Sequence, residues 1–318
     1  MSVVRRVSAA RTARVAAVAA ATTIATLAAV APASAAGQLN GNWAPFNRCP
    51  VDNAAMLGAD GIDNQATCVS SSSASGVIKI GSSVVPTGKT DLQVGIVTHS
   101  DGTNSVVAPS DGALIADPAD LPGGLLGLMC PSSVPVVSAV CGQITNSTLN
   151  RVVATVESVG TPSDFQLLAG VSEGVPIISI PVRIHLSNPL IGGNCYIGTK
   201  SAPVVLRPGN AAAPSIAADN ATSNGTPNPE GPFGRLALTG STQQDLTFAA
   251  PGASGCGPLG LGAFNWAVNL KSGLPAASGV NSVKLNNTST YLGTLNDPGA
   301  TAPNQGKTFS QYWHSAVK

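Results

Sequence analysis

Apolar and polar residues alternate over several stretches of the chain. In "DLQVGIVT", Leu92, Val94 and Ile96 share one face. A period of two is typical of a strand with one buried face. Three more segments alternate in the same way and are expected to be strands: 151–158 ("RVVATVES"), 176–186 ("PIISIPVRIHL") and 263–271 ("AFNWAVNLK", with Trp266 in the core).

Helical periodicity is rare after residue 35. Only "CPVDNAAML" (49–57) suggests a short helix, whereas 35 glycines and 24 prolines supply many turns. Short alternating strands joined by tight turns are typical of all-β proteins. The sequence therefore predicts an antiparallel β-sandwich of Greek-key type with disulfides and long loops, and a β-barrel is the second choice. Pro181 would place its strand at an edge or at a bulge, because proline cannot donate to the ladder.

Two segments interrupt the strand pattern. Residues 208–232 are rich in proline, asparagine and alanine, and we expect a long loop that either divides the exported chain or crosses a single domain. Residues 121–144 carry no charge, but their prolines and glycines argue against a membrane-spanning helix. A buried or folded-back loop is favoured. The alternative is an exposed patch that contacts lipid or protein, with the candidate contact residues Leu125, Leu126, Leu128, Met129, Val136 and Val137.

The N-terminus has the pattern of a secretory signal peptide. A basic head with four arginines precedes an uncharged apolar run, and Ala33 and Ala35 form an A-x-A cleavage pattern. We expect cleavage after Ala35, which would leave residues 36–318 as the mature protein. The expected location is therefore extracellular or in the cell envelope.

All six cysteines lie in the exported part. An even number outside the cytoplasm favours disulfides. Pairing of neighbours gives Cys49–Cys68, Cys130–Cys141 and Cys195–Cys256, and other pairings remain open. Zinc sites need closely spaced cysteine pairs, and none is present. No metal site or cofactor is expected.

Charge does not favour nucleic acid as a partner. The whole chain has 16 lysines and arginines against 15 acidic residues, and four of the arginines lie before Ala35. The remaining basic residues are scattered singly, so the basic stripe that tracks a phosphate backbone is missing.

The segment "GVSEG" (170–174) fits G-x-S-x-G, the pattern around the reactive serine of many hydrolases. That serine needs a strand before it and a helix after it. Here an alternating segment with two prolines follows, so the pattern predicts a hairpin turn and no catalytic residue is assigned. The alternative is a secreted serine hydrolase that uses Ser172 with His185 or His314.

Three segments resemble sequences that recur in a group of secreted actinobacterial proteins. They are "WAPFNRCPVDNAAMLGADG" (43–61), "DLQVGIV" (91–97) and "VRIHLSNPLIGGNCYIG" (182–198). The resemblance implies export and disulfides, and it carries over no catalytic or binding residue.

The favoured function is a non-catalytic protein, secreted or associated with the cell envelope, that contacts a surface, a lipid or another protein. A serine hydrolase using Ser172 is one alternative. A pore-forming barrel of the envelope is the other, because the chain has low charge and short alternating strands.

Overall fold

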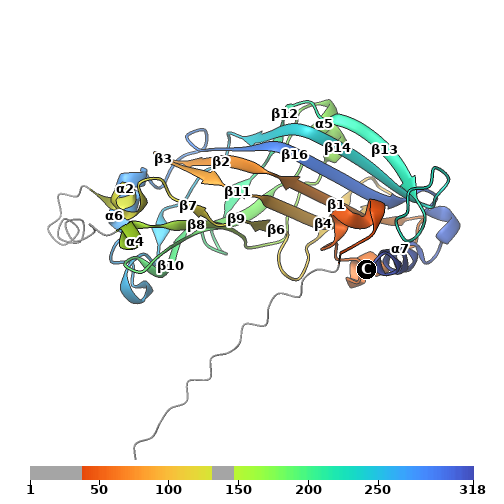
Figure 1. The fold of residues 1–318 in the computed structure, drawn as a ribbon, viewed down its shortest axis with the longest axis horizontal. Coiled ribbons are helices and arrows are strands. Elements are labelled where there is room, and N and C mark those ends of the chain that lie inside the picture. The colour runs from red at the N-terminus through yellow and green to blue at the C-terminus, as the bar shows by residue number, and fades with distance from the viewer. Residues whose placement is uncertain (1–37, 131–146) are drawn as a thin grey trace, which may run out of the picture. The chain divides into compact units, whose positions relative to one another are not determined.

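A computed structural model describes residues 38–130 and 147–318. Residues 36–318 form one compact unit. All its described strands belong to one antiparallel sheet, shown in Figure 1. Along the main path the strands follow the order β12 (Gly209–Ala212), β14 (Phe233–Asp245), β16 (Ser282–Leu295), β1 (Asn64–Ser73), β4 (Thr90–His99), β6 (Leu114–Ala116), β8 (Val153–Ser158), β9 (Ile180–Asn188), β10 (Gly192–Ile197) and β15 (Ala253–Ser254).

Six further strands pair at the margins of this path. The added pairs are β2 (Ser75–Ile80) with β16, β3 (Ser83–Thr87) with β2, β5 (Asn104–Val107) with β4, β7 (Ala119–Asp120) with β8, β11 (Val204–Leu206) with β9, and β13 (Ser215–Ala221) with β14. The sheet is open, with β12 and β15 at the ends of its path. The antiparallel, sandwich-like all-β fold predicted from the sequence is confirmed.

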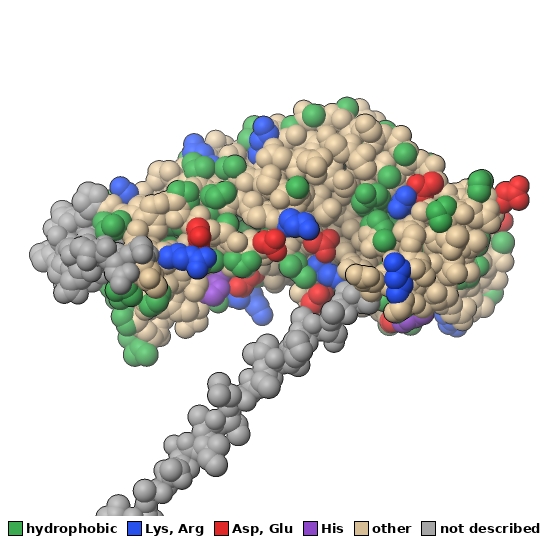
Figure 2. All heavy atoms as spheres, in the orientation of Figure 1, with side chains coloured by type: hydrophobic (Ala, Val, Ile, Leu, Met, Phe, Trp, Pro, Cys, Tyr) green, Lys and Arg blue, Asp and Glu red, His purple; other side chains and the backbone are tan. Residues whose placement is uncertain are grey.

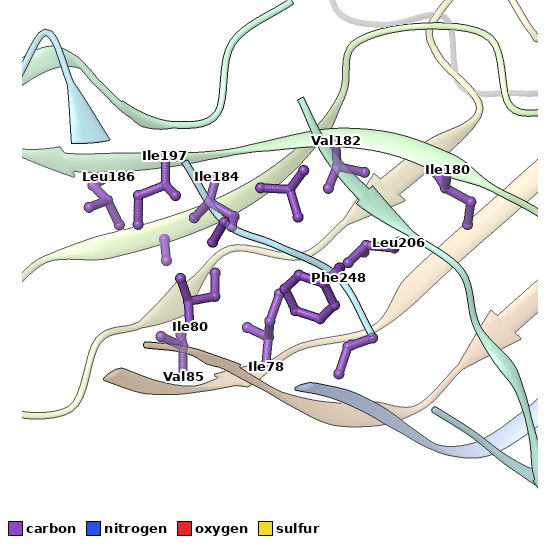
Figure 3. Close-up of a cluster of buried hydrophobic side chains, with 14 of the residues drawn as sticks. Ile78, Ile80, Val85, Ile180, Val182, Ile184, Leu186, Ile197, Leu206 and Phe248 are labelled. Carbon is purple, nitrogen blue, oxygen red and sulfur yellow. The ribbon is translucent and has the colours of Figure 1, made fainter. Parts of the chain in front are cut away.

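The main core lies between two parts of the sheet. Figure 3 shows Ile78, Ile80 and Val85 of β2 and β3 on one side and the side chains of β9 on the other. The inward positions of β9, from Ile180 to Leu186, are all buried, as the alternation predicts. Burying each such aliphatic side chain stabilises the fold by about 1.5–3 kcal/mol.

A second core covers the outer face of β1, β4 and β16. The segments that form it are η1 (Gly41–Phe46), α1 (Ala54–Leu57) and α7 (Gln305–Ser315). Trp43 stacks on Phe233 with ring centroids 3.7 Å apart, and Phe309 packs against its edge. Gly293 of β16 leaves room for these rings, because a Cβ there would lie 2.9 Å from the Phe46 ring. The segments near the N-terminus and the C-terminus of the unit therefore pack onto the sheet as helices.

The remaining helices of the described residues are short. They are α2 (Gly124–Met129), α4 (Ser147–Asn150), α5 (Leu167–Ser172), η2 (Pro258–Gly260), α6 (Asn265–Ser272) and η3 (Gly299–Thr301). Figure 1 places α2, α4, α6 and β10 at one end of the unit and α7 at the other. None of the helices in the described residues has the length and apolar character needed to cross a bilayer.

Several predicted elements are confirmed. Strand β4 contains the alternating segment "DLQVGIVT", with Leu92, Val94 and Ile96 buried. Strand β8 lies in 151–158, and the short helix predicted in 49–57 is α1, which Asn53 caps by accepting a hydrogen bond from the Ala55 amide.

The strand predicted for 263–271 is wrong, because the helix α6 begins at Asn265 and covers the rest of this segment. Phe264, Ala267 and Val268 are buried, which is the i, i+3, i+4 spacing of a helix face. Trp266 and Leu270 lie four residues apart on the opposite face, and Trp266 is exposed rather than in the core. Phe264 and Val268 fit a period of two and a helical period equally well.

Two further expectations are wrong. Residues 208–232 contain the strands β12 and β13, which pair with β14, and do not form one long loop. Of the two placements expected from Pro181, the edge strand is wrong, because β8 and β10 pair with the two sides of β9. The irregularity is present: the β8 pairing stops at Val182, and the next bridge joins Ser163 to Ser179. Pro181 is tolerated as the second residue of β9, beyond the last residue paired with β8, where its carbonyl accepts from the Val159 amide.

Candidate apolar ligand site

Two adjoining cavities lie between the two parts of the sheet. The first has a volume of about 50 Å³ and the second about 30 Å³, and the side chains of Ile78, Ala116 and Val156 line both. We call this pair the inner cavity. Ile180 and Leu206 line its first part, whereas Leu186 and Ile197 line its second part, as the labelled side chains in Figure 3 illustrate.

The walls of the inner cavity carry almost no charge. Among the described residues, none that lines the first part is charged, and Asp117 is the only charged one that lines the second part. Asp117 is exposed and therefore belongs to the rim. A buried charge without a partner costs several kcal/mol, so this cavity does not suit a charged group. An apolar void of this kind accepts an apolar occupant, which regains the dispersion contacts that the empty space lacks.

Hydroxyl groups lie on one wall of the first part. Ser73 bonds with Thr90 at 2.7 Å, and both line the cavity. Thr288 of β16 is only 1% exposed, and its Oγ1 has no hydrogen-bond partner among the described residues. The half-buried Thr87 also has an unpartnered Oγ1 and lines both parts. Buried hydroxyls normally find a partner, so the Thr288 hydroxyl on the cavity wall is a candidate hydrogen-bonding group for an occupant.

The inner cavity ends under the short helices. Leu128 of α2 and Ser272, the last residue of α6, line its second part. Helix α2 packs against α6, and Ala267 and Val268 of α6 belong to the main core. Helix α6 therefore closes one end of the inner cavity.

The predicted contact residues have different positions. In α2, Leu125 and Leu128 are buried in the main core and Leu126 is half-buried against it, so these three leucines help to hold α2 on the fold. Met129 is the last residue of α2. Val136 and Val137 lie outside the described residues, and the contact patch stays a prediction.

Two of the three predicted disulfides are confirmed. Cys49–Cys68 ties the segment after η1 to β1, and Cys195–Cys256 ties β10 to the segment before η2. Cys130 is also disulfide-bonded, and its predicted partner Cys141 lies outside the described residues. Disulfides persist in oxidising compartments, and these bonds indicate an environment outside the cytoplasm.

Ser172 is the last residue of α5, so the hairpin turn predicted at 170–174 is wrong. Leu167 and Gly170 are buried and fix the helix on the core. The Ser172 hydroxyl donates to the Leu168 carbonyl at 2.9 Å. In the described residues no hydrogen bond joins Ser172 to His185 or His314, and the hydrolase alternative stays a prediction.

His314 contacts the carboxylate of Asp52 at 2.9 Å, and Ser310 donates to the same carboxylate. Partial burial acts to raise the pKa of Asp52, but these hydrogen bonds outweigh it and leave the pKa below its usual value. Both the serine and the histidine bond to the aspartate, so this group lacks the serine-to-histidine bond of a catalytic triad.

His185 belongs to a cluster on β8, β9 and β10. Glu157 accepts from Arg183 at 2.6–2.7 Å and lies 3.2 Å from His185 Nδ1, while His185 Nε2 contacts the Gly193 carbonyl. The Tyr196 ring lies under Arg183 and stacks with His185. Each charged group has a partner here, so the cluster holds three strands together.

Arg48 is the centre of a second polar cluster. Its buried guanidinium pairs with Asp91 at 3.2 Å and Asp111 at 3.3 Å and donates to the Gly112 carbonyl. Burial raises the pKa of Asp91, although the charge of Arg48 opposes the shift. An open hollow of about 530 Å³ lies beside Asp91 and Gln93, whose side chains already bond with Arg48 and Asn47.

The described residues contain no group of three side chains placed to hold a metal ion. Comparisons with protein-family models, with curated proteins and with solved structures find no match to this chain.

Proposed function

We propose that this protein is an exported, non-catalytic binding protein that holds an apolar chain, such as the acyl chain of a lipid, between the two parts of its sheet. The observation that carries the proposal is the inner cavity, which combines apolar walls with the unpartnered Thr288 hydroxyl. The signal-peptide pattern and the disulfides support export.

The chemistry of the walls favours one class of ligand. The apolar walls suit a single alkyl chain, and the hydroxyls suit an uncharged polar group such as an alcohol or an ester. The two parts together leave only about 80 Å³ (50 Å³ and 30 Å³), so the two parts of the sheet must move apart to admit the chain. A fatty acid anion would bury its carboxylate where no cation lines the wall. We therefore expect a monoacylglycerol to bind more tightly than the corresponding fatty acid at neutral pH.

Filling the inner cavity is expected to abolish this binding. Ala116 lines both parts, and Ala116→Phe would occupy the space that the alkyl chain needs. We expect at least a tenfold loss of affinity for the monoacylglycerol, equivalent to about 1.4 kcal/mol. Titration with a fluorescent monoacylglycerol measures the two affinities.

Ile115 provides the matched control for this experiment. It precedes Ala116 in β6, but it is exposed and does not line the inner cavity. Ile115→Phe should bind the monoacylglycerol as the unmodified protein does. If neither variant changes binding, or if the unmodified protein binds no monoacylglycerol, the proposal is wrong.

Replacing Thr288 with valine should have opposite effects on stability and binding. Valine has nearly the same shape but no hydroxyl, so the ligand-free protein should gain about 1–3 kcal/mol of stability when an unpaired buried group is removed. Binding of the monoacylglycerol should weaken by roughly fivefold, because a typical hydrogen bond contributes about 1 kcal/mol. Urea unfolding and the same titration measure the two effects.

Thr290 serves as the control for this substitution, because its hydroxyl already bonds with Ser71 at 2.8 Å. Thr290→Val should therefore lower stability. A loss of stability in Thr288→Val as well would show that the Thr288 hydroxyl has a partner within the fold.

A further inference from the structure

Large apolar side chains are exposed at the end of the unit that carries α6. Leu259 is 89% exposed, Leu261 80% and Leu270 76%, and Trp266 is exposed beside them in the sequence. We call these four residues the leucine end. Figure 2 shows hydrophobic side chains at the surface of this end, where Figure 1 labels α6 and β10. Large exposed apolar patches mark surfaces that contact a protein or a membrane.

Folding does not explain the position of Leu259. Its backbone is left-handed, with φ of +58°, a conformation that is unfavourable for a residue with a Cβ. The same loop uses glycine at its other positions of positive φ: Gly257, Gly260 and Gly262. A leucine that is both strained and solvated contributes nothing to the core, which points to a function outside the fold.

The loop is held rigidly. Cys256 ties its start to β10 through the disulfide with Cys195, and the Phe264 amide bonds with the Cys256 carbonyl. Asn265 also accepts from the Cys256 amide. Leu259 and Leu261 are therefore presented on a fixed loop, and little conformational entropy is lost when they insert into another phase.

The composition of this end favours a lipid surface as the partner. Residues 256–273 contain one charged residue, Lys271, and no acidic residue. On α6, Trp266 and Leu270 form the outer face, and the exposed Lys271 follows them. Tryptophan and leucine beside lysine are typical of segments that lie in a bilayer interface, where lysine attracts anionic headgroups.

Helix α6 takes part in both the inner cavity and this outer face. Helix α6 contributes Ser272 to the cavity wall, while its opposite face carries Trp266 and Leu270. A bilayer that contacts the outer face is thus separated from the cavity by one short helix.

We infer that the leucine end docks onto a lipid bilayer, with the side chains of Leu259, Leu261, Trp266 and Leu270 inserted at the interface. The docking surface goes beyond the proposed function. Transfer of a lipid chain between the bilayer and the inner cavity would rest on that function as well.

Flotation with vesicles tests the docking. Vesicles of phosphatidylcholine, with and without phosphatidylglycerol, are mixed with the full mature protein. We expect the bound fraction to rise with phosphatidylglycerol, because Lys271 favours an anionic surface. Two double variants, L259S/L261S and W266S/L270S, should each lower the partition coefficient at least about tenfold, since each removes two inserted apolar side chains.

The control is Ile62→Ser. Ile62 is 69% exposed and precedes β1, which packs against α7 at the other end of the unit. This variant should bind vesicles as the unmodified protein does. All the altered side chains are exposed, and thermal unfolding should confirm that each variant is folded.

Tryptophan emission gives a second readout. Trp43 is buried and Trp313 is half-buried in α7, whereas Trp266 is exposed. Vesicles should therefore shift the emission to shorter wavelength, and Trp266→Phe should remove that shift. Absence of vesicle binding, unchanged binding in both double variants, or an equal loss in Ile62→Ser would overturn the inference.

The two proposals can fail separately. Ala116→Phe should lose the monoacylglycerol and keep vesicle binding, whereas L259S/L261S should keep the monoacylglycerol and lose vesicle binding. If the protein binds vesicles through the leucine end but binds no monoacylglycerol, the docking proposal is supported and the proposed function is wrong.

Discussion

Replacing Trp43 with alanine is expected to lower the free energy of unfolding by about 4 kcal/mol. Trp43 is completely buried, and it contacts the rings of Phe233, Phe309 and Phe46. Removal of a buried aromatic ring costs its transfer energy and leaves a cavity, and typical losses are about 3–5 kcal/mol. The hydrogen bond from the indole to the Ser223 carbonyl is also lost. Urea unfolding followed by circular dichroism measures the change.

The matched comparison is Trp266→Ala, which removes the same ring from an exposed position. Because Trp266 is 38% exposed and partly covered by the fold, we expect a loss of about 1–2 kcal/mol, well below that of Trp43→Ala. Similar losses in the two variants would mean that the aromatic cluster is not the structural centre of this part of the fold.

Loss of the Cys195–Cys256 disulfide should have an effect of similar size. The bond closes a loop with a sequence separation of 61 residues, for which the chain-entropy model gives about 4 kcal/mol. Both cysteines are fully buried, and replacing both with alanine leaves no unpaired thiol in the core. Urea unfolding under non-reducing conditions measures the loss.

Removal of Cys49–Cys68 provides the comparison, because its separation of 19 residues gives about 3 kcal/mol in the same model. C49A/C68A should therefore be the more stable of the two double variants. The reverse order would show that native packing around the sulfurs, rather than loop length, determines their contribution.

Strands with one strictly alternating buried face could be predicted from the sequence. In β9 the β-branched residues Ile180, Val182 and Ile184 all point inward, and no helical spacing competes with this pattern. By contrast, α6 has only eight residues, and its apolar positions fit both periods. Strand β13 could not be predicted, because its residues are mostly exposed and it is held by pairing with β14 rather than by a buried face.

The candidate site could not be predicted for a different reason. The inner cavity is formed by residues such as Ile78, Val156 and Leu206, which come from strands far apart in the sequence. No local pattern marks an inward threonine such as Thr288 as unpartnered. The leucine end could be predicted in part, because the segment "CGPLGLG" is rich in leucine and glycine. The strand predicted for 263–271, however, places Trp266 in the core.

The ends of the described chain meet in space. Leu39 forms a bridge with Val317, and the Lys318 amide donates to the Gln38 carbonyl. The two ends of the described chain therefore lie side by side near α7, at the end of the unit that is away from α6 (Figure 1). A label or solid support attached at Lys318 would be held on that side, leaving the face with Leu259 and Trp266 free to meet a bilayer in a fixed orientation.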